Sequence, residues 1–474
     1  MSQTNDVKTP AHFPTFRRWF ARLGKLPFLS RAWWKRNARR LAFVGLFVVA
    51  LWTTANIYAT FALNRELNAI KQRGEPLTLA ALEPKIPDNE NAATVYQKAF
   101  KLLRYEEHEN SAMLGFDRNQ KPLTSQQKFI ARERIFSHNR ATTQLIFQAV
   151  KMPKYQVDID FSSSENIEKA FKSFSYVREF ARFMGAQAEH EANRGNRAQA
   201  FRCVAAVYRM TDQVAQEPVV MQMLVGIAME HIGHAALARV LDVAPLSSNE
   251  AQNAAAQLPR SNWDQVLQRA IWNDRAETLK DFQDSSRWWR MMTDSGDGSG
   301  EASFWISLRD QFYLDQFLAY TLTPLRKLDT ASYLRLDRFE ENADIPWFAR
   351  VTQDVASDVI KTRQNTERAT DVRAMARIAL ALKLWKQTHS NYPKSLSELS
   401  AIPIASLPNA LKRKTIGYKT QGDKFLLYGF GLNRRDDGGK SNNYDPLNPD
   451  SQIFGDDDDD FPWRQSLGVK KPKN

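Results

Sequence analysis

The chain has 474 residues, of which 43% are hydrophobic, and its formal net charge is +13. A chain of this length can bury an adequate core, and its one cysteine excludes an internal disulfide. Residues 1–40 hold ten of the 66 Lys and Arg and one of the 53 Asp and Glu, which leaves +4 for the rest. Positive charge concentrated beside an apolar run is explained by anionic lipid, so it does not indicate a nucleic-acid-binding protein.

Residues 1–40 form a basic leader that we expect in the cytoplasm. Four large apolar residues within it recur at helical spacing: Phe16, Trp19, Phe20 and Leu23. With arginines on the other side, they predict a short amphipathic helix at the membrane interface, so that residues 16–64 contact the bilayer and anionic head groups. The alternative is a disordered leader that only sets topology, because Gly24 and Pro27 would end a helix early.

Residues 41–64 predict one transmembrane helix. They carry no charge, and at ~1.5 Å per residue they cover roughly 36 Å, against about 30 Å of hydrocarbon. Residues 21–40 contain seven Lys or Arg and residues 64–83 contain three, so we expect a cytoplasmic N-terminus and a translocated body. The run is too extended for a cleaved signal peptide, which favours a single-pass signal-anchor in the inner (cytoplasmic) membrane.

Residues 65–91 predict an extended linker, because Pro76, Pro84 and Pro87 interrupt them. Residues 92–353 then predict a helical domain, with few glycines and with prolines as punctuation. Arg194-Gly195-Asn196 predicts a tight turn between two antiparallel helices, and Pro218 predicts the start of a third, ending near Leu241.

The pair of helices around this turn resembles a tetratricopeptide-like hairpin, with small alanines that allow a close approach. The 34-residue signature of such repeats does not recur. We therefore predict an irregular helical bundle or a short α-solenoid, in a chain that is mainly α.

Few residues of the helical body suggest chemistry. His231 and His234 lie three apart beside Glu230, yet a third zinc ligand is not identifiable, so ordinary packing is favoured. Cys203 has no local histidine partner and is expected to be a small buried residue. No nucleophile elbow, phosphate-binding loop or zinc-protease motif is present, so we predict no catalytic residue.

Residues 354–463 predict a long helix followed by a small β module, and residues 464–474 form a basic tail. An apolar stripe at helical spacing covers about 354–388. A Tyr-Pro break and a short helix follow, and then two β-rich runs within Thr415–Phe430 predict a hairpin with Gly422 in the turn.

Residues 371–463, with ALALKLWKQTHSNYPKSLSEL, the YKT and FLLYGFG strands and NRRDDGG, resemble the C-terminal region of the major pseudopilin of type II secretion systems. That resemblance implies a helix, a Tyr-Pro loop, a small antiparallel sheet and an acidic calcium-binding loop. The whole layout also resembles uncharacterised single-pass membrane proteins of bacteria. The apolar helix lacks the prepilin cleavage site and acidic fifth residue, so the chain is not a pilin subunit.

Calcium is the one possible cofactor, and Asp436 and Asp437, with Asp456–Asp460, are its candidate ligands. Calcium takes six to eight oxygen ligands, and carboxylates are dense here. No EF-hand pattern is present, so a solvated acidic loop is the alternative.

Three functions are consistent with these features. The first is a non-enzymatic, membrane-anchored scaffold or interaction protein of the cell envelope, with a protein partner bound by the helical body. The second is a component of a secretion or pilus-like assembly. The third is an envelope hydrolase whose carboxylate pair sequence alone cannot locate.

Overall fold

The computed structural model describes most of the chain. The described residues are 31–82, 86–104, 113, 121, 123–157, 164–243, 246–283, 350–421, 424–431, 434–439 and 460–463. The predicted interfacial helix of the leader, Gly422 of the hairpin turn, Asp456–Asp459 and the basic tail 464–474 lie outside them.

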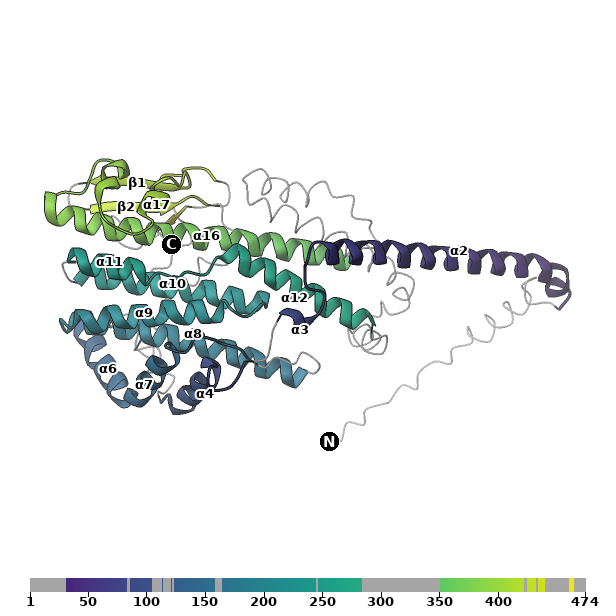
Figure 1. The fold of residues 1–474 in the computed structure, drawn as a ribbon, viewed down its shortest axis with the longest axis horizontal. Helices are drawn as coiled ribbons and strands as arrows, with labels where there is room; N and C mark the ends of the chain where they lie inside the picture. Colours follow the sequence, from purple (N-terminus) through teal and green to yellow (C-terminus); the bar gives the residue numbers. More distant parts are fainter. Residues whose placement is uncertain are drawn as a thin grey trace, which may run out of the picture.

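The described chain is mainly helical and ends in a small antiparallel sheet. Its α-helices are α2 (Arg31–Gln72), α3 (Leu79–Leu82), α4 (Ala92–Leu102), α6 (Ser125–His138), α7 (Arg140–Ala149), α8 (Ser164–Asn193), α9 (Arg197–Val214), α10 (Val220–Val243), α11 (Ser248–Ala256), α12 (Trp263–Gln283), α16 (Arg350–His389) and α17 (Leu407–Leu411). Helices α8, α9, α10 and α16 run side by side through the body, and α2 projects from one end of it (Figure 1).

The predicted turn between two antiparallel helices is confirmed. Helix α8 ends at Asn193 and α9 begins at Arg197. Between them Gly195 has a φ of +80°, which glycine adopts without strain. The Asn196 side chain then accepts a hydrogen bond from the Gln199 amide and caps α9. Buried alanines let α8 and α9 pack closely behind this turn.

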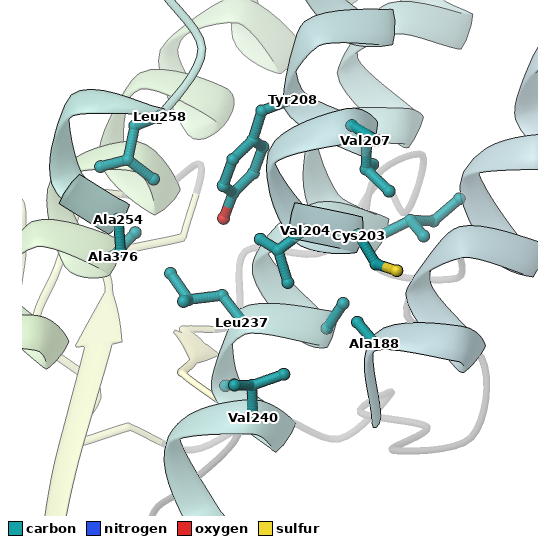
Figure 2. Packing of buried hydrophobic residues seen from close by; sticks show 14 of the residues in the cluster. Ala188, Cys203, Val204, Val207, Tyr208, Leu237, Val240, Ala254, Leu258 and Ala376 are labelled. Carbon is teal, nitrogen blue, oxygen red and sulfur yellow. The ribbon is translucent and has the colours of Figure 1, made fainter. Parts of the chain in front are cut away.

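The third predicted helix is confirmed, although it begins at Val220 rather than at Pro218. Two of its glycines face aromatic rings: a Cβ on Gly233 would lie 2.6 Å from the Tyr208 ring, and one on Gly226 would lie 2.7 Å from Trp263. Figure 2 shows Tyr208 among the apolar side chains that fill the core beside α10. Glycine therefore brings the α10 backbone close to its neighbours.

Helix α10 is long and apolar enough, by composition, to cross a membrane, and 78% of its apolar window is buried inside the protein. It contacts α8, α9, α12 and α16.

Cys203 of α9 lies in the same core with no exposed surface, and burial raises the pKa of its thiol. A buried thiol with a raised pKa is typical of a cysteine that packs in a core rather than one that reacts.

The long helix and the hairpin predicted near the C-terminus are confirmed. Helix α16 has 40 residues, and a 3₁₀-helix, η3 (Leu396–Ala401), follows the Tyr-Pro break. Strands β1 (Ile416–Gln421) and β2 (Lys424–Gly429) pair antiparallel, with Ile416 opposite Gly429. A third strand that the sequence did not indicate, β3 (Phe461–Pro462), pairs with β2.

Candidate functional site

The middle of α2 presents exposed apolar side chains. The described ones at least 37% exposed are Leu41, Phe43, Val44, Leu46, Phe47, Val48, Val49, Leu51, Ile57 and Phe61. The hydroxyls of Thr53 and Thr54 donate to the carbonyls of Val49 and Ala50, each at 2.8 Å. Backbone acceptors in the same helix satisfy these polar groups, as a hydrocarbon environment requires.

The base of α2 is fixed to the body by a buried ion pair. Just beyond the helix, Glu75 accepts a 2.8 Å hydrogen bond from Arg275 of α12, and both side chains are 2% exposed or less. Arg275 also donates to the Pro76 carbonyl at 2.9 Å, and Arg73 donates to the other Glu75 oxygen at 2.8 Å. Ile70, in the last turn of α2, is 1% exposed. The C-terminal end of α2 is therefore attached to the body by buried contacts.

The segment after this base also follows the body closely. Helix α3 contacts α12. The Ile86 amide donates to the Gln156 side chain at 2.9 Å. Asn91 exchanges two hydrogen bonds with the Gln156 backbone and caps α4 through the Ala93 amide. The described parts of residues 65–91 are thus held by side chains rather than behaving as a spacer.

A buried polar network lies at the centre of the body, around Glu230 of α10. Arg373 of α16 donates to both carboxylate oxygens at 2.7 Å, and the Trp263 indole donates to one of them at 2.6 Å. His234 lies 3.2 Å from Glu230 through Nε2 and 2.9 Å from the Tyr208 hydroxyl through Nδ1. Because an ionised carboxylate only accepts, Nε2 of His234 carries the proton, and Nδ1 accepts from the Tyr208 hydroxyl.

Residues from neighbouring elements cover the network around Glu230. Arg373 also donates to the Ser261 carbonyl at 2.8 Å. The ring of Trp463, next to β3, lies 6.0 Å from the His234 ring. The C-terminal strand therefore returns to cover the centre of the helical body, and it joins the β module to the same core.

Burial and pairing set the protonation states of the network. Burial alone would raise the pKa of Glu230, but the Arg373 charge and the hydrogen bonds from Arg373 and His234 hold it well below its usual range. Burial lowers the pKa of His234, although Glu230 opposes this. Burial and the Glu230 charge raise the pKa of Tyr208. Near neutral pH the network thus holds one carboxylate, one guanidinium and a neutral imidazole, each with its partners satisfied.

The two histidines singled out for zinc have separate environments. His234 belongs to the network, whereas Nδ1 of His231 donates to the Ile227 carbonyl of its own helix at 2.9 Å. Within the described ranges, no three His, Cys, Asp or Glu side chains are arranged to hold a metal ion. The arrangement of these two residues is that of packing.

The calcium candidates lie in a tight Asp-Asp-Gly-Gly turn beside β2. One Asp436 oxygen accepts hydrogen bonds from the Tyr428 hydroxyl at 2.7 Å and from the Gly438 amide at 2.9 Å. Asp460 accepts from the Gly439 amide at 2.8 Å. Burial raises the pKa of Asp460, and the charges of Asp437 and Asp436 add to this effect. Calcium binding by Asp436 and Asp437 remains a prediction, in a turn that is already hydrogen-bonded.

The sequence located the helices but did not indicate which residues pair between them. It placed Glu230 and His234 on one helix, but Arg373 lies 143 positions away and Trp263 lies 33 positions away. Arg275 pairs with Glu75 across 200 positions. An arginine in an otherwise apolar helical stripe was the one available signal, because a buried cation requires an acid elsewhere.

The chain matches no protein-family model, no curated protein and no solved structure. The resemblances to pseudopilins and to tetratricopeptide hairpins therefore rest on their motifs. In the segment with the Tyr-Pro motif, the Tyr418 hydroxyl of the hairpin donates to the Pro393 carbonyl at 2.8 Å.

Proposed function

We propose that the protein is a membrane-anchored, non-enzymatic scaffold or interaction protein of the cell envelope. The observation that carries the proposal is the exposed apolar middle of α2, together with its buried attachment at Glu75 and Arg275. Ten exposed apolar side chains on one helix are costly in water. A bilayer around residues 41–64 removes that cost.

The body then lies close to the membrane surface on the translocated side. Helix α2 has 42 residues, which gives about 63 Å at 1.5 Å per residue. Its last eight residues, 65–72, continue the helix for about 12 Å beyond the predicted span. The cation asymmetry around the span favours a cytoplasmic N-terminus.

At two buried acids of the helical body, Glu230 and Glu189, the pairing favours a scaffold role over catalysis. Glu230 is saturated by Arg373, Trp263 and His234. Glu189 is paired with Lys128, Arg132 and Arg239, which lower its pKa against the effect of burial. Hydrolysis by a carboxylate pair needs one acid with a raised pKa near one open base. Neither of these two acids is free for such a role.

A place in a secretion or pilus-like assembly is the second candidate. The three-stranded module after α16, with its Tyr-Pro contact and Asp-Asp-Gly-Gly turn, favours it. Co-purification with a secretion ATPase or secretin is the measurement that separates this role from that of a general scaffold.

Fractionation and a topology reporter test the anchor. We expect the full chain to stay in the membrane pellet after carbonate extraction, and alkaline phosphatase fused after Asn474 to be active. A cytoplasmic reporter at the same position should be inactive. Release of the chain by carbonate would overturn the anchor, and the opposite reporter pattern would overturn the orientation.

A further inference from the structure

A groove of about 460 Å³ lies between α7 and the α8–α9 hairpin. Its size is in the range of ligand-binding sites. Helices α6 and α7 lie toward the end of the body away from the projecting end of α2 (Figure 1). The lining residues are Phe136, Arg140, Thr143, Gln144, Phe147, Gln148, Lys151, Gln187, Gln199 and Arg202. Three of them are cations and none is an acid.

The three cations of the groove differ from most described arginines of the body. Arg132, Arg239 and Arg373 form ion pairs with buried carboxylates. Within the part of the chain that the structure describes, neither Arg140 nor Lys151 lies within ion-pair distance of an acid, and Arg202 instead stacks on Phe147, 4.2 Å from the ring centroid. Unpaired cations that line one groove favour an anionic occupant.

Amide side chains supply the rest of the polar lining. Gln187 is 7% exposed and its oxygen lies 3.5 Å from the Thr143 hydroxyl, while its amide nitrogen donates to no described residue. Gln144 and Gln148 lie one turn apart on the exposed side of α7. A primary amide offers both donors and an acceptor, as a peptide bond does, so these side chains can pair with a peptide backbone.

The spacing of Arg140 and Lys151 along the chain favours a chain over a small anion. Arg140 opens α7 and Lys151 follows its end, eleven residues later. At 1.5 Å per residue the two backbone positions are displaced by about 16 Å along the helix axis, a spacing that favours a chain over a phosphate or a short dicarboxylate. Two carboxylates four residues apart lie on the same face of an extended peptide, about 14 Å apart, and the long cationic side chains cover the remaining difference.

We infer that this groove binds an extended acidic peptide segment of a partner protein. Its two outer carboxylates pair with Arg140 and Lys151, its backbone pairs with the glutamines, and Phe147 with the stacked Arg202 forms the middle of the floor. The inference deepens the interaction role proposed above by giving the chemistry of the partner.

Fluorescence anisotropy on the full chain in detergent micelles tests it with three labelled hexapeptides. One peptide has glutamates at positions 1 and 5, which share a face of an extended chain, one has the two glutamates adjacent, and one has glutamines in their place. We expect the spaced peptide to bind at least fivefold more tightly than the adjacent one and the uncharged one not to bind. Arg140→Gln or Lys151→Gln should each abolish the preference for spacing. Lys394→Gln, which removes an exposed cation elsewhere, should keep it.

Three outcomes would overturn the inference. The first is equal affinity for the spaced and adjacent peptides. The second is an equal loss in the Lys394→Gln control. The third is displacement of the spaced peptide by an equal concentration of glutarate, which would assign the groove to a small anion. Carbonate extraction of the same variants tests the membrane anchor separately. If the chain stays in the membrane but binds no peptide, this inference is rejected and the proposed anchor is not.

Discussion

Helices α2 and α10 are both rich in apolar residues, and the molecule places them in opposite environments. Helix α10 lies in the centre of the body, with 78% of its apolar window buried. Helix α2 leaves the body, and the described large apolar residues of its segment 41–64 are exposed. Apolar composition alone does not separate these two cases, because a core helix and a membrane span have the same composition.

The difference lies in the polar residues of the two helices. Helix α10 contains Glu230, His234 and Arg239, and each has a partner on another helix or on its own. Residues 41–64 contain no charge, and the hydroxyls of Thr53 and Thr54 donate to carbonyls of their own helix. Ionisable residues with distant partners are typical of a protein core, whereas an apolar run without any is typical of a membrane span, the role proposed for residues 41–64.

The largest expected effect comes from charging the exposed helix. Val48→Lys together with Leu51→Lys places two cations near the middle of the span. Each costs roughly 3 kcal/mol at the centre of a transmembrane helix. We expect the doubly substituted chain to lose carbonate-resistant membrane retention while the unfolding midpoint of its body stays unchanged.

The matched substitution in α10 should give the reverse result. Ala236→Lys buries an unpaired charge at a fully buried position, so we expect the body to unfold while α2 still inserts. If both variants leave the membrane and both keep a folded body, the contrast between the two helices is wrong.

Removal of the Glu230 charge should give the next largest effect. Glu230→Gln keeps the shape of the side chain but leaves Arg373, whose side chain is 12% exposed, without its counter-charge. Breaking a buried pair in this way costs about 3–5 kcal/mol of unfolding free energy, measured by urea titration.

Glu250→Gln is the control for this change, because Glu250 pairs with Arg197 where both are about one-third exposed. Exposed pairs contribute roughly 0–1 kcal/mol. If Glu250→Gln lowers the unfolding free energy as much as Glu230→Gln does, the central network does not stabilise the body more than an exposed ion pair.

These polar partners mark the limit of what the sequence predicted. Apolar spacing, Gly195 and the prolines located α8, α9, α10 and α16, because those signals are local. Strand β3 has two residues and follows an acidic run, so no pattern distinguished it. Its place is set by pairing with β2 and by the burial of Trp463, and neither can be read from neighbours in the chain.

The pH dependence of stability should be a smaller effect of the same network. Since burial lowers the pKa of His234 in the folded state, the unfolded chain takes up that proton first as the pH falls below about 6.5. Stability is therefore fully present above this pH and declines below it, by up to about 1.4 kcal/mol per pH unit. The depressed pKa of Glu230 acts in a separate window, below about 4.3.

His234→Gln should flatten the upper part of this profile, between pH 6.5 and 5. Urea titrations at half-unit steps measure it. An unchanged slope in the variant would assign the decline to another group.

Calcium should give the smallest effect, and it concerns the turn that closes the β module. If Asp436 and Asp437 bind the ion, calcium at tenfold excess over its dissociation constant should stabilise the protein by about 1.4 kcal/mol. Thermal melts in calcium and in chelator measure the shift. Asp436→Asn with Asp437→Asn should remove it, and an equal shift in that variant would assign any binding to other residues.

If residues 41–64 span a bilayer as proposed, the ion pair at the base of α2 couples the direction of that span to the direction of the body. An apolar run of roughly 36 Å in about 30 Å of hydrocarbon is then accommodated by a tilt from the membrane normal. Because Arg275 of α12 holds both Glu75 and the Pro76 carbonyl just beyond α2, we expect the body to tilt with the helix. A thicker membrane would bring the helix upright and lift the far end of the body, so lipid thickness becomes a control on how far α7 reaches from the surface.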